Sequence, residues 1–314
     1  MGRHPDSISG RPPTVFTATP ASSRRHILAE GPVWVPETGT ILWIDVEAGS
    51  VFEGRLEGDS VEESWKLDFD GRVGAAVRGI DGSVLVATSD RLVVVPASGD
   101  RFDGPVIVPA GVQSRTNDGA CDAAGRLLVG TLALDGREGE EGLYRVEDDG
   151  TLTTIDSDLS LSNGLGWSPD GALLYSTDTV PGVIWVRGYD AVTGAIGERR
   201  EHLRLDGESP DGLCVDSAGN LWVAIWGAGE VRSFSPEGEL LATVEVSCPS
   251  PSSVAFVGEK LDVLLITTAS RDLSEAELQQ YPDAGRVYLA RVGATGTPTF
   301  PWSASWADTV RQAR

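Results

Sequence analysis

The sequence predicts an all-β fold, a six-bladed β-propeller, and three observations lead to it. The chain of 314 residues contains 38 Gly and 18 Pro spread along its length, which indicates many tight turns instead of long helices. A hairpin pattern recurs in which two short apolar runs flank an Asp/Gly/Asn turn, as in residues 209–227. The turn glycines of successive copies lie roughly 40 to 50 residues apart, which is typical of one four-stranded blade per repeat.

The elements follow from this repeat in chain order. Residues 1–13 carry two Arg and a Pro pair and are expected to be a disordered leader, the propeller is expected over 14–302, and 303–314 are expected to be a C-terminal tail. Six copies of the hairpin are recognised by their turn glycines, which are Gly39, Gly82, Gly125, Gly171, Gly219 and Gly258. A two-domain β protein, the alternative fold, leaves this even spacing unexplained.

Two further elements are expected at the ends of the repeat array. A strand near Val15 or Ile27 is predicted to pair with the last blade, because closing the ring removes an open sheet edge. Residues 272–280 combine helix-forming residues with Ser274 and Glu277 at capping-box spacing, which predicts a short helix. This helix is either a lid over one end of the central channel or a loop without a role there.

The charge balance and the cysteines restrict the function classes. Lys and Arg number 25 against 47 Asp and Glu, for a net charge of −22, which argues against binding to nucleic acid or to an anionic membrane. Cys121, Cys214 and Cys248 lie far apart and form neither a CxxC site nor a disulfide framework. This pattern favours a reducing compartment, and the cytoplasm is the expected location.

Four oxygen-bearing residues stand at the first position of their repeats. They are Glu30, Asn117, Asn163 and Asp211, and each is followed by Gly or by Asp-Gly. Because equivalent residues of successive blades point toward the same axis, we expect these side chains to converge at one mouth of the channel. Carboxylate and amide oxygens favour hard cations such as Ca²⁺, Mg²⁺ or Mn²⁺. The alternative is that they are ordinary turn residues that bind no ligand.

Other catalytic constellations are missing from the sequence. There is no G-x-S-x-G elbow and no phosphate-binding Gly-rich motif, and the histidines (His4, His26 and His202) stand outside the repeat-start positions. These absences argue against a Ser-His-Asp hydrolase and against a His-rich zinc site. Arg115 lies two residues before Asn117, so on an extended strand it faces the same way and is positioned to meet an anionic or polyhydroxy ligand.

At these residues the chain resembles the gluconolactonase-like family that includes regucalcin (senescence marker protein 30) and luciferin-regenerating enzyme. The resemblance covers about residues 30 to 289 and is specific as a set of motifs. The motifs are Glu-Gly-Pro-Val-Trp at 30–34, Arg-Thr-Asn-Asp-Gly at 115–119, Ser-Asn-Gly-Leu-Gly-Trp-Ser-Pro-Asp at 162–170, Pro-Asp-Gly-Leu-Cys-Val-Asp at 210–216 and Tyr-Pro-Asp-Ala-Gly-Arg-Val-Tyr at 281–288.

The resemblance implies a six-bladed propeller with one catalytic divalent metal at one mouth of the channel. By motif, Glu30, Asn163 and Asp211 correspond to the ligands of that metal, and Asp211 also corresponds to the general base. Arg115 and Asn117 correspond to residues that contact the substrate. The ligands are all oxygens, so Ca²⁺, Zn²⁺, Mn²⁺ and Mg²⁺ are all admissible, and the resemblance leaves the choice among them open.

The chain departs from the family pattern at one place. Some members carry a sugar-contacting Glu after a Gly-Thr-Met stretch, whereas here Gly-Thr-Leu at 130–132 is followed by Ala133, Leu134 and Asp135. Either Asp135 takes over the substrate contact, or the Glu-rich loop at 138–141 does, through Glu138, Glu140 or Glu141, or the substrate differs.

The sequence therefore predicts a metal-dependent lactonase that hydrolyses sugar aldonolactones to aldonic acids. Its expected partner is a small-molecule lactone, and its oligomeric state is left open. One alternative is a non-catalytic propeller that binds calcium or a partner protein. The other is a metal-dependent esterase or phosphoesterase that acts on non-sugar substrates.

Overall fold

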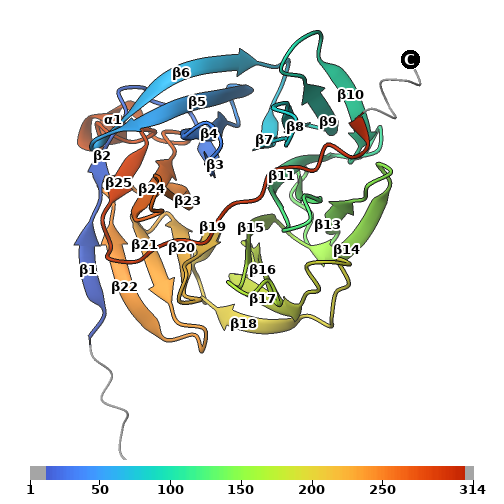
Figure 1. The fold of residues 1–314 in the computed structure, drawn as a ribbon. Coiled ribbons are helices and arrows are strands. Elements are labelled where there is room, and N and C mark those ends of the chain that lie inside the picture. Colours follow the sequence, from blue (N-terminus) through green and yellow to red (C-terminus); the bar gives the residue numbers. More distant parts are fainter. Residues whose placement is uncertain (1–11, 308–314) are drawn as a thin grey trace, which may run out of the picture.

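The computed structural model describes residues 12–307, which form six β-sheets arranged as a closed ring of blades (Figure 1). Within each blade the consecutive strands pair antiparallel, and the first strand of each blade lies nearest the central channel (Figure 1). Blade six packs against blade one through β23 and β3. The predicted all-β six-bladed propeller is confirmed.

Blades one to five each contain four consecutive strands, and blade six contains three, completed by a strand of the N-terminal segment. Blades one to three contain β3 (Ala29–Val35), β4 (Thr40–Asp45), β5 (Ser50–Glu57) and β6 (Ser60–Asp68); β7 (Val73–Arg78), β8 (Val84–Thr88), β9 (Arg91–Val95) and β10 (Phe102–Val106); and β11 (Ser114–Cys121), β12 (Leu127–Ala133), β13 (Glu141–Val146) and β14 (Leu152–Leu159). Blades four to six contain β15 (Ser162–Trp167), β16 (Leu173–Asp178), β17 (Val183–Gly188) and β18 (Arg200–Arg204); β19 (Ser209–Val215), β20 (Leu221–Trp226), β21 (Glu230–Phe234) and β22 (Leu240–Glu245); and β23 (Pro251–Val257), β24 (Val263–Thr268) and β25 (Tyr288–Ala290).

The core lies between the blades. β4 and β24 are buried along their whole length, whereas the outermost strand β18 is exposed or half-buried throughout. Inner strands are covered on both faces by neighbouring blades, so they consist of nearly continuous apolar runs instead of alternating ones. This is why the hairpin repeats of the sequence appear as short Val-, Leu- and Trp-rich segments.

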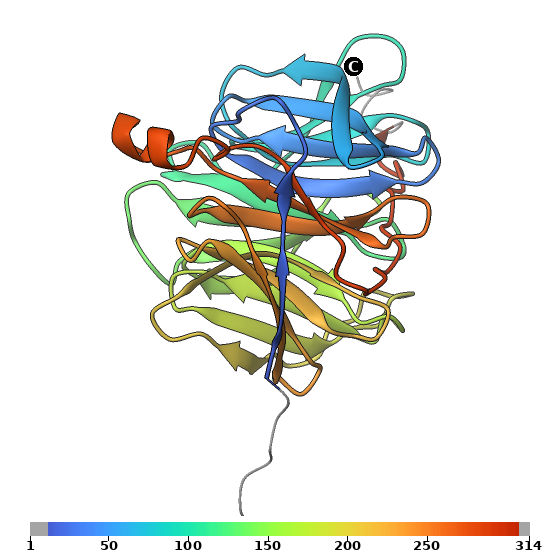
Figure 2. The ribbon, with the colours of Figure 1, turned by 90° about the vertical axis from the view of Figure 1, so that its left-hand side faces the viewer.

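The N-terminal segment closes the ring on two blades. β2 (Thr19–Pro20) pairs with β25 of the last blade, as expected for closure. Of the two positions expected for the closing strand, the one near Ile27 contacts the last blade, where Leu28 forms an isolated antiparallel bridge with Ala269. The other is wrong, because β1 (Thr14–Thr17), which contains Val15, runs parallel to β22 of blade five. Figure 2 shows the segment passing along the outside of both blades. The segment therefore covers the outer edges of two neighbouring sheets.

After β25 the chain crosses one face of the propeller (Figure 1). Gly296 of this segment forms an isolated bridge with Asp216 of blade five, and Trp302 forms one with Gly79 of blade two. Trp302 and Trp306 are each 1% exposed and pack into the core of blades two and three. Of the predicted tail, residues 303–307 belong to this packed segment and 308–314 lie outside the described residues. The predicted leader also lies outside them, except for residues 12 and 13.

The predicted helix is present as α1 (Glu275–Gln280), with Ser274 as N-cap and a complete capping box with Glu277. It lies in the connection between β24 and β25 and projects from the side of the propeller (Figure 2). None of its residues is buried. Within residues 12–307, no helix has the length and apolar character needed to cross a membrane.

Candidate active site at one mouth of the channel

A polar cavity of about 600 Å³ opens at the mouth where the innermost strands begin. It brings together five of the six predicted site residues, from blades one, three, four and five. They are Glu30, Arg115, Asn117, Asn163 and Asp211. The repeat-phase argument therefore places these side chains correctly in space.

A β-bulge aims these side chains into the channel. The register of each innermost strand shifts at the same place, between Glu30 and Val33 in β3, between Asn163 and Leu165 in β15, and at the equivalent position of the other four blades. A bulge re-aims the neighbouring side chain and increases the local twist. Gly164 lies in one bulge with φ 27°, and a Cβ there would lie 2.5 Å from the carbonyl oxygen of Asp211. Glycine therefore allows blades four and five to approach closely at the site.

A chain of hydrogen bonds fixes the amide side chains. The Arg115 guanidinium donates to the Asn117 Oδ1 (2.9 Å), and the Asn117 Nδ2 donates to the Asn163 Oδ1 (2.7 Å). The Asn163 Nδ2 donates in turn to the Thr179 hydroxyl (2.9 Å), which donates to the carbonyl of Pro210 (2.7 Å). This network determines which atom of each amide is the oxygen, and it links the cavity wall from blade three to blade five.

The two predicted carboxylates lack a compensating partner. Burial raises the pKa of Glu30 well above its usual range, and the charges of Asp211 and Asp118 raise it further. Burial, followed by the charge of Asp118, likewise raises the pKa of Asp211. The Asp211 Oδ1 is buried without a hydrogen-bond partner. The positive charge of the Arg115 guanidinium offsets part of this increase. Burial and the nearby cation Arg72 lower the pKa of Arg115 itself to about 10.

Asp118 is a member of this electrostatic group that sequence reasoning did not single out. Burial raises its pKa to about 6, although the backbone N–H groups of Gly119 and Gly164 donate to its carboxylate. The available signal was its place between Asn117 and Gly119 in the repeat. A strictly alternating strand would turn it away from the channel, and the bulge between Thr116 and Gly119 changes that orientation.

The donor set fits a divalent cation with oxygen ligands. Glu30 and Asp211 supply two carboxylates with raised pKa values, Asn163 supplies an amide oxygen, and one Asp211 oxygen lacks any protein donor. Among the described residues no three His, Cys, Asp or Glu side chains form a ligating group, so a site here depends on the amide. His26 lies elsewhere, buried against Trp43 and Phe52.

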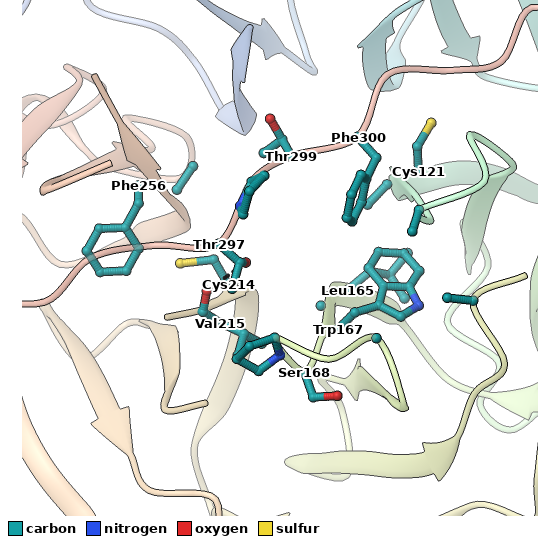
Figure 3. A pocket seen from close by; sticks show the side chains of 18 of the residues that line it. Cys121, Leu165, Trp167, Ser168, Cys214, Val215, Phe256, Thr297, Thr299 and Phe300 are labelled. Atoms are coloured by element: carbon teal, nitrogen blue, oxygen red, sulfur yellow. Dashed lines mark hydrogen bonds between the residues drawn. The ribbon is translucent and has the colours of Figure 1, made fainter. Parts of the chain in front are cut away.

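A second cavity, of about 260 Å³, lies at the opposite mouth and has a mostly apolar lining. Figure 3 shows Trp167 and Phe300 facing each other across it, with Thr297 and Thr299 on the segment that crosses the channel. The hydroxyls of both threonines donate to backbone carbonyls, and burial raises the pKa of the Cys214 thiol beside them. The polar chemistry of the channel is therefore confined to the first mouth.

Comparison with known proteins agrees with this geometry. Residues 28–270 match the model of the SMP-30/Gluconolactonase/LRE-like region. The chain belongs to this family. It is 33% identical over 279 residues to the pentonolactonase XacC of Haloferax volcanii (87% of this chain, 94% of the relative) and 32% identical over 274 residues to the 6-deoxy-6-sulfogluconolactonase of Pseudomonas putida (86% and 93%).

Solved structures of the SMP-30/gluconolactonase/LRE-like family share the whole propeller. A calcium-binding regucalcin from Agrobacterium tumefaciens superposes with a TM-score of 0.84 at 26% identity, covering 92% of this chain and 98% of that one. A luciferin-regenerating enzyme gives a TM-score of 0.81 at 26% identity, covering 89% and 96%. The family resemblance read from the motifs is thus confirmed along nearly the full chain.

The residues expected to replace the family's sugar-contacting Glu do not reach the cavity. Asp135 is exposed and forms an ion pair with Arg137 (2.8 Å). Arg137 also binds Glu141 (2.6 Å) and lies 3.6 Å from Glu140, while Glu138 is exposed. Three of the four acidic residues are therefore gathered around one arginine, and none of the four lines the cavity.

Proposed function

We propose that this protein is a divalent-metal-dependent lactonase that hydrolyses sugar-derived lactones to the hydroxy acids. The observation that carries the proposal is the convergence of Glu30, Asn163 and Asp211 in one cavity, with an Asp211 oxygen that no protein group satisfies. Two relatives more than 30% identical are named as a pentonolactonase and a sulfogluconolactonase, which supports ring-opening of a lactone as the reaction.

In this proposal Glu30, Asn163 and Asp211 hold the metal through their oxygens. A divalent ion in such a site polarises the substrate carbonyl and lowers the pKa of a neighbouring water. Its identity among Ca²⁺, Zn²⁺, Mn²⁺ and Mg²⁺ is part of the test, and the Agrobacterium relative is described as calcium-binding.

The remaining chemistry belongs to the protein's own groups. The Asp211 carboxylate takes the proton of the attacking water. The water oxygen bonds to the lactone carbonyl carbon, the ring C–O bond breaks, and the ring oxygen receives that proton from Asp211 to become the hydroxyl of the product. Arg115 and Asn117, fixed by their hydrogen bonds, hold the lactone in place.

The test is a lactone panel assayed on metal-stripped protein before and after restoring each of the four ions. We expect about one ion per chain by elemental analysis, activity lost with chelation and regained with metal, and a large loss of metal in Glu30→Gln. Glu37→Gln, on an exposed turn beyond the same strand, is the matched control and should keep both metal and activity. Full activity in metal-free protein would refute the proposal.

We also place the protein in the cytoplasm. Cys121, Cys214 and Cys248 are all free thiols, two of them buried, and burial raises the pKa of each. Free thiols are typical of a reducing compartment. Detection of the native protein in a cell fractionation, by an antibody raised against it, tests this placement.

A further inference from the structure

The cavity lining combines charged and apolar groups. On the side of blades one, two and six, Glu47 accepts hydrogen bonds from the Arg72 Nε (2.7 Å) and the Arg271 Nη1 (3.3 Å), and all three side chains line the cavity. Blades three and four contribute four apolar residues to the lining, beside the hydrogen-bonded polar residues already described. We call these four apolar residues the apolar wall: Leu132, Leu134, Leu161 and Val180.

The apolar wall is one continuous surface. Leu132 forms a β-bridge with Leu161 across the blade boundary, and the Leu161 carbonyl accepts from the backbone N–H of Thr179 (3.1 Å), the residue before Val180. Leu134 lies two residues beyond Leu132, hence on the same face of the extended chain. The backbone N–H of Leu134 donates to the Gln113 carbonyl (2.8 Å). The pairing of β12 with β11 therefore continues to Leu134 and supports this orientation.

The two rim residues of the apolar wall remain open to solvent. Leu134 is 50% exposed and Val180 is 49% exposed, on neighbouring blades and in the same cavity. A ligand that covers them removes apolar surface from water, which is favourable. A ligand hydroxyl placed against them would lose its water without gaining a partner. The loop carboxylates Asp135 and Glu141 are paired with Arg137 and do not line the cavity, so neither is placed to receive it.

We propose that the lactone carries a deoxygenated, alkyl end that lies on the apolar wall, while its hydroxyls face Arg115 and the Glu47 side of the cavity. This inference rests on the proposed lactonase function and specifies its substrate class. The preferred substrates are deoxyaldonolactones, not aldonolactones with a hydroxyl on every carbon.

A pair of lactones that differ in a single hydroxyl tests the proposal. L-rhamnono-1,4-lactone is the 6-deoxy form of L-mannono-1,4-lactone, and D-fucono-1,4-lactone bears the same relation to D-galactono-1,4-lactone. With metal-loaded protein we expect kcat/KM to be about tenfold higher for the deoxy member of at least one pair, since a half-open apolar wall discriminates modestly against an added hydroxyl. Equal or better use of both fully hydroxylated lactones overturns the proposal and leaves the lactonase function standing.

A variant pair assigns the preference to the apolar wall. Leu134→Gln should lower the deoxy-to-parent ratio of kcat/KM at least threefold, because the amide can pair with the added hydroxyl. Val192→Gln alters a side chain that is 85% exposed and outside the cavity, and it should leave the ratio unchanged. An unchanged ratio in Leu134→Gln overturns the assignment. Both positions are exposed enough for the substitutions to leave the fold intact.

Binding separates this inference from the proposed function. If no lactone of the panel is hydrolysed after metal is restored, the lactonase function is wrong, and calorimetric dissociation constants for the two lactone pairs decide the inference. Tighter binding of the deoxy lactone, weakened in Leu134→Gln, supports the apolar wall as a recognition surface. Tighter binding of the parent, or binding of neither, overturns it.

Discussion

Replacing Asp211 by Asn removes a negative charge from the site and leaves the size of the side chain nearly unchanged. The side chain is 6% exposed, its Oδ1 has no partner, and its charge faces those of Asp118 and Glu30. In metal-free protein the amide removes one buried charge from this group, so we expect stability to rise by about 1–2 kcal/mol. For a chain of this size that corresponds to a melting temperature higher by about 1.5–3 °C.

The same substitution should abolish most of the activity. An amide cannot accept the proton of the attacking water, and loss of a general base alone lowers kcat by roughly 10²–10⁴. We expect the affinity for metal to fall as well, because the ligand set loses one negative charge. The assay is differential scanning fluorimetry of chelated protein together with kinetics at saturating metal.

Asp216→Asn is the matched control for a buried aspartate. Asp216 is 1% exposed, but its carboxylate accepts from the Asn220 Nδ2 (2.9 Å), the Trp222 Nε1 (3.0 Å) and backbone N–H groups. Its replacement should lower the melting temperature and leave the kcat of the folded protein near wild type. If Asp211→Asn retains near-wild-type turnover and melts no higher than wild type without metal, Asp211 is an ordinary turn residue and the reasoning fails.

Three further predictions concern substrate binding, pH and the crossing segment. Asn117→Ala should raise KM about tenfold with metal content retained, because a positioned donor is lost; metal loss equal to that of Glu30→Gln would contradict this. The folded-state pKa of Asp118, about 6, exceeds its usual 3.8, so the protonated group stabilises the fold below about pH 4 and this contribution disappears as pH rises through 6. Metal-free protein should therefore melt at a higher temperature at pH 5 than at pH 8, and Asp118→Asn should reduce this dependence of the melting temperature on pH. An unchanged dependence would exclude Asp118 as its cause. Trp306→Ala should lower the unfolding free energy in urea by about 3–5 kcal/mol with little change in kcat, and a loss below 1 kcal/mol would mean that the segment contributes little.

The sequence by itself determined the propeller and most of the site. Glu30, Asn117, Asn163 and Asp211 share one phase of the repeat, and equivalent positions of rotationally related blades meet at the axis. Any sequence with that phase must bring these residues together once the ring closes. The orientation of Arg115 was predicted from the alternation of side chains along a strand, because Arg115 lies two residues before Asn117. These inferences needed only local periodicity and the symmetry of the fold.

Tertiary structure alone decided the features that depend on contacts between distant segments. The strand that contains Val15 pairs with blade five because two edges needed covering, and no local pattern distinguishes them. Trp306 is buried because the last segment crosses the face of the propeller, although residues 303–314 were expected to be a tail.

The candidate site likewise has features that the sequence predicts and features that only tertiary contacts decide. The bulge brings Asp118 into the electrostatic group of Glu30 and Asp211, and a strictly alternating strand would have excluded it. Asp135 is adjacent in sequence to the residues that line the cavity, yet its ion pair with Arg137 turns it toward the loop. Leu134 lines the cavity in its place. Repetition in the sequence fixes where the blades and their axial residues lie, whereas the direction of each neighbouring side chain depends on bulges and ion pairs that form only when the blades pack.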